Sequence, residues 1–173
     1  LGQINATDSY GNITSGGHGG AIMWVGYNGD VYNCTFTNNS AYGKGGAAYL
    51  QGSSRDNCTN TTFDNCTFTS NYARLNGGAV DWYIGASFGL VNNCIFTNNI
   101  ANRTAGAIYW SGHDGNVTNC IFINNTALGN IVDTDSYGNL TPGGHGGALR
   151  WVGPNGYVYN CTFTNNTSKR HGG

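Results

Sequence analysis

The chain has 173 residues, of which 29 are glycine and 2 are proline, and its formal net charge is −1. Only 9% of the residues are charged, against about a quarter in an ordinary globular domain. Nucleic-acid binding depends on clustered lysine and arginine. Because the seven such residues here are scattered along the sequence, we expect no nucleic-acid partner. An aromatic content of 13% argues against disorder.

No apolar run reaches the roughly 18 residues of a membrane helix. The first residues also lack the basic and apolar regions of a signal peptide. We therefore expect any targeting signal or anchor to lie outside this sequence.

Two short phrases alternate along the chain. The first is led by glycine, reads GGAxxW in its commonest form, and begins at Gly19, Gly45, Gly77, Ala105 and Gly146. The second, NC[TI]FxxN, contains Cys34, Cys66, Cys94, Cys120 and Cys161, which follow one another at intervals of 26 to 41 residues. Near-constant phrases with spacers of variable length are typical of repeat proteins that stack similar coils and carry loop insertions.

A longer repeat has an offset of 127 residues, so that residues 1–46 reappear as 128–173 with about 32 of 46 positions identical. The phrases DSYGN, GGHGGA and VYNCTFTNN recur intact in both copies. Tandem arrays show such self-similarity. We therefore predict that residues 1–173 form one β-helix segment of a longer array.

Side-chain direction in the glycine-led phrase follows from the two-residue period of a strand. Ile22 and Trp24 occupy positions that stay apolar in most copies, which predicts that they point into the core. The position between them varies without a common chemistry and is therefore expected to face solvent. Its occupants are Met23, Tyr49, Asp81, Tyr109 and Arg150.

In the second phrase, Val31, Cys34 and Phe36 are apolar in every copy and are expected to point inward. The variable position at Tyr32 is expected to point outward. Asn33 recurs where the two-residue period breaks, and asparagine tolerates the left-handed backbone that would bend one strand into the next. The predicted core ladders are Cys34, Cys66, Cys94, Cys120 and Cys161, with Phe36, Phe68, Phe96, Phe122 and Phe163. A ladder of stacked amides is predicted at Asn39, Asn71, Asn99, Asn125 and Asn166.

These patterns predict an all-β protein, a right-handed parallel β-helix of about five coils with loop insertions. No single coil could bury its apolar face, so neighbouring coils would stack about 4.8 Å apart and continue one core. The alternative is a β-sandwich, which would use different core residues in successive antiparallel strands. The repetition of one phrase at equivalent positions disfavours it.

The phrases GGA[IVAL] and NC[TI]FxxN, repeated along the whole chain, resemble the repeats of chlamydial polymorphic outer-membrane proteins. They also resemble the Asn- and Thr-rich adhesin-like proteins of methanogenic archaea. The resemblance implies a parallel β-helix displayed outside the cell, at the cell surface or in the cell wall, with a role in adhesion or envelope structure. Ala105, which replaces the first glycine in one copy, is the departure from the pattern.

The cysteines have two interpretations. Five share one inward position, which favours a ladder of buried free thiols over disulfides, because stacked Cβ vectors run parallel rather than converging. Cys58 lies off the ladder in an insertion and is expected to be the most reactive. No CxxC pair that could hold zinc is present, and we expect no cofactor.

Several other motifs carry weaker predictions. Sequons expected on exposed loops, and so candidates for glycosylation, are at Asn5, Asn12, Asn60, Asn102 and Asn139. Asp133 and Asp135 resemble part of a calcium-binding loop. His18 and His145 occupy equivalent positions about four coils apart, too far to share a metal ion, and are expected to be structural or exposed turn residues.

The aromatic residues offer the best candidates for ligand contact. The four tryptophans share one inward position and are expected to fill the core. Outward tyrosines combine a flat apolar face with a hydroxyl group, which suits contact with glycans or proteins. The candidates are Tyr32, Tyr49, Tyr109, Tyr157 and Tyr159.

We expect an adhesin-like or envelope repeat protein whose partners are other cell-surface proteins or glycans. One alternative is a polysaccharide-active enzyme with its active site outside this segment, because neither variable position pairs two carboxylates and the chain has no glutamate. No catalytic residue is therefore assigned. Another alternative is a subunit that self-associates end to end into a filament or sheath.

Overall fold

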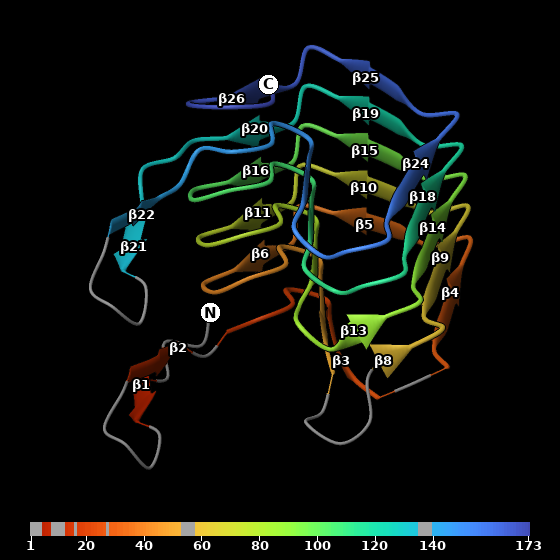
Figure 1. The fold of residues 1–173 in the computed structure, drawn as a ribbon, viewed down its shortest axis with the longest axis horizontal. Helices are drawn as coiled ribbons and strands as arrows, with labels where there is room; N and C mark the ends of the chain where they lie inside the picture. Colours follow the sequence, from red (N-terminus) through yellow and green to blue (C-terminus); the bar gives the residue numbers. More distant parts are fainter. Residues whose placement is uncertain (1–4, 8–12, 16, 27, 53–57, 135–139) are drawn as a thin grey trace.

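The structure is a computed structural model that describes residues 5–7, 13–15, 17–26, 28–52, 58–134 and 140–173. In this part of the chain all regular secondary structure is β-strand. Four parallel five-stranded sheets run along a solenoid, and each coil contributes one strand to each sheet (Figure 1). The chain is thus a right-handed parallel β-helix of five coils, as predicted.

The glycine-led phrases form the first sheet. Its strands are β3 (Ile22–Val25), β7 (Ala48–Gln51), β12 (Val80–Trp82), β17 (Ile108–Trp110) and β23 (Leu149–Trp151). The residues before the cysteines form the second sheet, with β4 (Asp30–Tyr32), β9 (Thr62–Asp64), β14 (Leu90–Asn92), β18 (Asn116–Thr118) and β24 (Tyr157–Tyr159).

The residues after the cysteines form the third sheet, with β5 (Thr35–Thr37), β10 (Thr67–Thr69), β15 (Ile95–Thr97), β19 (Ile121–Ile123) and β25 (Thr162–Thr164). The fourth sheet holds β6 (Ser40–Ala41), β11 (Tyr72–Ala73), β16 (Ile100–Ala101), β20 (Thr126–Ala127) and β26 (Thr167–Ser168). Equivalent residues pair in register, so that Phe68 lies between Phe36 and Phe96. This register is what stacks identical side chains on one another.

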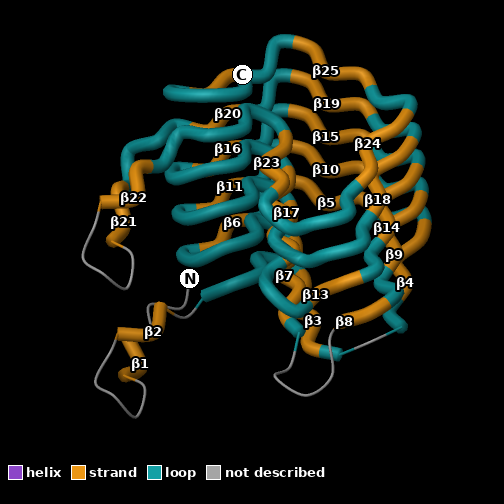
Figure 2. Tube along the Cα trace, in the orientation of Figure 1, coloured by secondary structure: helices purple, strands orange, loops and turns teal. Residues whose placement is uncertain are grey.

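In the described part of the chain, three further strand pairs lie outside the four sheets (Figure 2). β8 (Cys58–Thr59) pairs in parallel with β13 (Ala86–Ser87). Two antiparallel hairpins pair β1 (Asn5–Thr7) with β2 (Ile13–Ser15), and β21 (Val132–Thr134) with β22 (Leu140–Pro142). The two hairpins have the same register after an offset of 127 residues, so the long sequence repeat is also a structural one.

The core consists of the predicted ladders. Phe68 and Phe96 are fully buried, and their ring centroids lie 4.7 Å apart with the planes inclined by 2°. Trp82 and Trp110 are equally buried, with centroids 4.2 Å apart. Phe163, on the last coil, is 48% exposed because no further coil covers it in the structure.

Asparagine holds the bends between strands. Asn33 has a φ of 55° and its four equivalents have nearly the same value, which confirms the predicted left-handed bend. The amide ladder is also confirmed: the Nδ2 of Asn71 donates to the Oδ1 of Asn99 at 2.9 Å, and that of Asn99 donates to the Oδ1 of Asn125 at 2.9 Å.

Glycine is needed at the two positions of each glycine pair for different physical reasons. The first lies in the left-handed region, with a φ of 65° at Gly45. The second has no space for a side chain, since a Cβ at Gly46 would lie 2.0 Å from the carbonyl oxygen of Gly78 on the next coil. Ala105 takes the left-handed conformation (φ 60°) despite its Cβ, so the exchange of glycine for alanine in this copy places strain in the backbone.

One expectation about the first sheet is wrong. Tyr49 and Asp81, predicted to face solvent, are 3% and 0% exposed, and Tyr109 is half-buried. They do point away from the core, but the loops that join the fourth sheet to the first cover them. The two-residue period of a strand distinguishes its two faces and does not reveal that a loop covers one of them.

Candidate binding face on the arm loops

The loops that lead from the fourth sheet to the first stack on one another beside the solenoid. We call residues 42–47, 74–79, 102–107, 128–134 with 140–148, and 169–173 the arm loops; strands β21 and β22 belong to the fourth of them. Backbone hydrogen bonds join each loop to the next, such as Leu75 N to Gly43 O at 2.8 Å and Arg103 N to Leu75 O at 3.1 Å. Equivalent positions therefore follow one another at the spacing of the coils.

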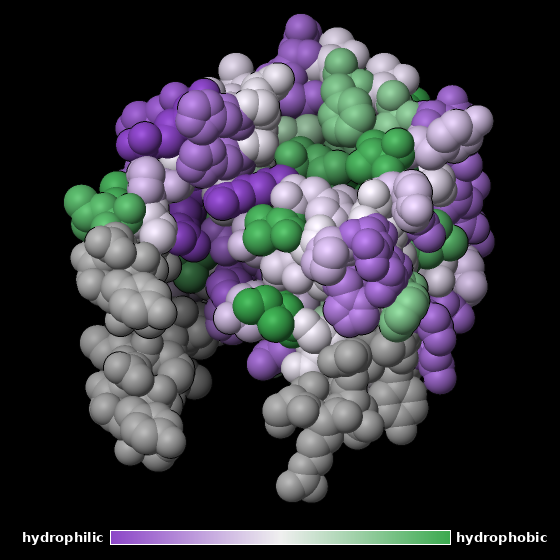
Figure 3. Space-filling view, in the orientation of Figure 1, coloured by the Kyte–Doolittle hydropathy of each residue, from purple (hydrophilic) through white to green (hydrophobic). Residues whose placement is uncertain are grey.

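The lysine and arginine residues gather at these loops. Among the described residues, the arm loops carry Lys44, Arg74, Arg103, Lys169 and Arg170. Arg150 lies on β23, and its Nη1 donates to the Oγ1 of Thr104 in an arm loop at 3.2 Å. Figure 3 shows hydrophilic residues gathered in the hollow between the arm side and the body of the solenoid.

This clustering corrects the expectation that the cations are scattered. They are far apart in sequence, but the coil period brings them to one side of the molecule. A signal was present in the sequence, because the cations of the arm loops fall one to three residues before a glycine-led phrase or before the glycine pair Gly172–Gly173. These cations are Lys44, Arg74, Arg103, Lys169 and Arg170. Aligning the spacers as well as the phrases would have revealed it.

Aromatic side chains pack against several of these cations. The Nζ of Lys44 lies 3.5 Å from the ring centroid of Tyr83, and the guanidinium carbon of Arg74 lies 4.4 Å from that of Tyr42. Such contacts are favourable because the face of an aromatic ring is negative. They also hold the long side chains in defined positions.

One polar residue directly precedes each glycine-led phrase, and these residues form a row beside the outer surface of the first sheet. They are His18, Lys44, Asn76, Thr104 and His145. Backbone bonds connect the row from coil to coil, as in Gly45 N to Asn76 O at 2.9 Å. His18 begins the row: its ring stacks on Tyr49 with centroids 4.5 Å apart, and its Nδ1 accepts from the Lys44 N–H at 3.0 Å. His145 stacks on His171 at 5.2 Å. Both predicted turn histidines therefore have structural contacts.

Asp81 lies beneath this row. Neither of its carboxylate oxygens has a hydrogen-bond partner, although both are buried. Burial raises the pKa of Asp81 to about 8, against the opposing attraction of Lys44 and Arg103. Asp81 is therefore largely protonated at neutral pH and supplies little negative charge to the arm loops.

The other described acids whose side chains are placed lie elsewhere. Asp30 and Asp64 are on the second sheet, and Asp114 is in the loop between β17 and β18. Asp114 Oδ2 is 2.6 Å from His113 Nδ1, and this hydrogen bond lowers the pKa of Asp114. None of the acids whose side chains are described lies in an arm loop; Asp133 lies in the arm loop that holds β21, and its side chain is outside the described residues.

The predicted tyrosine contacts do not form one site. Tyr32, Tyr157 and Tyr159 are exposed on the second sheet, but the first belongs to coil 1 and the other two to coil 5. Tyr49 is buried and Tyr109 is half-buried beneath the arm loops. Burial and the nearby Asp81 raise the pKa of Tyr109.

The predicted modification and metal residues are described only in part. The side chains of Asn5 and Asp133, and the whole of Asn12, Asp135 and Asn139, lie outside the described residues. Asn60 is exposed, whereas the Oδ1 of the half-buried Asn102 accepts from Asn130 Nδ2 at 2.9 Å. Glycosylation of these sites stays a prediction. In the described part of the chain, no group of three His, Cys, Asp or Glu residues could hold a metal ion.

The ladder cysteines are free thiols in the structure. Cys66, Cys94 and Cys120 are buried, while Cys34 is exposed on the first coil. The Sγ atoms of Cys94, Cys120 and Cys161 each accept from the backbone N–H of the preceding ladder cysteine, at 3.4 Å in all three cases. The side chain of Cys58 lies outside the described residues.

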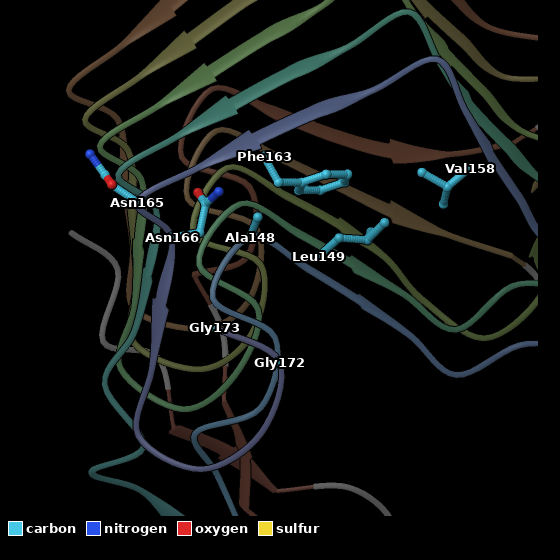
Figure 4. A pocket seen from close by; sticks show the side chains of 8 residues that line it. All are labelled: Ala148, Leu149, Val158, Phe163, Asn165, Asn166, Gly172 and Gly173. Atoms are coloured by element: carbon cyan, nitrogen blue, oxygen red, sulfur yellow. The ribbon is translucent and has the colours of Figure 1, made fainter.

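A pocket of about 360 Å³ opens at the last coil (Figure 4). Its lining includes Leu149, Val158, Phe163 and Asn166, which occupy the core-ladder positions of coil 5. The same positions on coil 1 are covered by coil 2. The pocket is therefore the uncovered end of the core, and we assign it no ligand.

The fold and the repeated ladders define this chain as a parallel β-helix repeat protein with a cationic face on its arm loops. Residues 33–51 match the family model of the Chlamydia polymorphic membrane protein repeat, so the chain is similar to that family over one repeat, including one arm loop. No curated protein and no solved structure matches the chain. Within the described residues, the structure has no helix long and apolar enough to cross a membrane.

Proposed function

We propose that this chain is part of a surface-displayed, adhesin-type repeat protein that attaches a cell to glycans or proteins through its arm loops. The observation that carries the proposal is that core positions are constant from coil to coil whereas the arm loops vary. Core positions keep the same residue from coil to coil, as in the phenylalanine ladder. The arm loops differ in length and sequence, and carry the clustered cations.

The similarity over residues 33–51 to a polymorphic membrane protein repeat supports a location at the cell surface. The solenoid supports the proposal in a second way. A stack of coils is long and regular, and its loops can change without disturbing the core, which suits a surface that meets varied partners.

The test has two parts. Antibodies raised against the purified chain should label intact cells of the source organism, and beads coated with the chain should bind members of a panel of glycans and extracellular proteins. Beads coated with the chain carrying Asn99→Ala and Phe96→Ala, whose fold should be lost, are the control. Labelling only after lysis, or equal binding by both bead types, would contradict the proposal.

A further inference from the structure

The cations of the arm loops form a row along the solenoid axis. Gly144 N donates to Arg103 O at 2.6 Å and Arg170 N donates to Gly144 O at 2.8 Å, which continues the stacking already seen between the loops of Arg74 and Arg103. Neighbouring coils in a parallel sheet are about 4.8 Å apart. The backbone positions of these cations thus recur along the solenoid axis at a spacing of one or more coils.

The row remains accessible to a ligand. Lys169 and Arg170 are exposed, and Lys44 and Arg74 are half-buried against tyrosine rings. The one described carboxyl side chain beneath the row, Asp81, is buried and has no hydrogen-bond partner. The exposed Lys169 and Arg170 can therefore contact an external anion, as can the exposed parts of Lys44 and Arg74.

The aromatic rings beside the cations narrow the choice of anion. Tyr42 and Tyr83 each hold a cation against one face and are themselves half-buried. A tyrosine ring and its hydroxyl can contact the apolar face and the hydroxyls of a sugar. A linear row of cations with adjacent tyrosines complements a linear polyanion made of sugar units.

We propose that the arm loops bind an acidic polysaccharide, a chain carrying carboxylate or sulfate groups at regular intervals, which lies parallel to the solenoid axis. This inference rests on the proposed attachment function and names the chemical class of its ligand. Lys44, Arg74, Lys169 and Arg170 contact the anionic groups, and Tyr42 and Tyr83 contact the sugar rings.

The experiment measures binding of the whole chain to four immobilised probes: polygalacturonate, heparin, neutral dextran and duplex DNA. The test variant combines Arg74→Gln, Lys169→Gln and Arg170→Gln. The control variant combines Thr35→Glu, Thr37→Glu and Thr164→Glu, which changes the net charge by the same amount on exposed positions of the third sheet. Circular dichroism and urea unfolding confirm that both variants fold.

We expect the unsubstituted chain to bind polygalacturonate or heparin and to bind more weakly as salt is raised. The test variant should lose about tenfold or more in affinity, the equivalent of 1.4 kcal/mol, while the control variant loses less than threefold. Equal losses in the two variants, or tighter binding to DNA than to either polysaccharide, would overturn the inference.

The outcomes also separate this inference from the proposed function. If the chain binds only dextran, or only proteins in the bead panel, the ligand class is wrong and attachment stands. If the chain binds none of the probes and nothing in the panel, both proposals fail.

Discussion

Asp81 on β12 lies directly opposite Tyr49 on β7 in the parallel register, and both side chains are buried beneath the arm loops. Tyr109 lies opposite Asp81 on the other side. The result is a small polar layer outside the first sheet, separate from the apolar core. It joins the arm loops to the solenoid, so its stability affects how the candidate binding face is held.

Asp81 should make stability depend on pH. Its pKa is raised from 3.8 to about 8 in the folded protein, so the stability contributed by the protonated form is fully present below about pH 3.8. It is lost as pH rises through about 8. Asp81→Asn removes this dependence and should leave the variant more stable than the unsubstituted chain at pH 8, by a few kcal/mol at most.

Urea unfolding at several values between pH 4 and pH 8.5 measures this difference. The two proteins differ only at position 81, so every other titratable group contributes equally to both curves. The difference between the two curves therefore isolates Asp81. Parallel curves for the two proteins would show that Asp81 is ionised in the folded state.

The amide ladder should contribute most at the central coils. Asn99 is fully buried; its Nδ2 donates to Phe68 O and Asn125 Oδ1, and its Oδ1 accepts from Asn71. Asn99→Ala leaves buried groups without partners and should cost about 3 kcal/mol or more. Asn39→Ala, at the half-buried end of the ladder, should cost about 1 kcal/mol. Equal losses in the free energy of unfolding would contradict a cooperative ladder.

The strain at Ala105 predicts a stabilising substitution. Its φ is 60°, a region in which a Cβ costs about 1 to 2 kcal/mol. Ala105→Gly should raise the free energy of unfolding by about 1 kcal/mol, after the entropy of the added glycine is subtracted. Ala107→Gly, at a buried position that is not among the positive-φ residues, is the matched control and should destabilise. Loss of stability in both variants would show that the backbone near Ala105 is relaxed.

The thiol ladder predicts graded reactivity. Burial raises the pKa of Cys66, and a hydrogen bond with Cys120 together with burial raises the pKa of Cys94. Low thiolate content and poor access both slow alkylation. Iodoacetamide should therefore modify the exposed Cys34 in the native chain and modify Cys94 only after unfolding. Peptide mapping by mass spectrometry with and without urea measures this, and a disulfide between neighbouring ladder cysteines would refute the free-thiol interpretation.

The inward positions were predictable because their chemistry is local and repeated. Phe68, Cys66 and Val31 stand at fixed offsets in a phrase that recurs on every coil, and a strand of known period must place them on one face. Asn33 and Asn71 were predictable for a related reason, since a left-handed bend and a buried amide ladder each require asparagine at the same position on successive coils.

By itself, then, the sequence determined the β-helix, its register and the composition of its core. The tertiary structure alone decided what lies outside that core. Asp81 and Tyr49 are buried because loops that differ in length fold back over the first sheet and stack at the coil spacing. The path of a loop depends on contacts between residues far apart in sequence, and the two-residue period of a strand carries no information about such contacts.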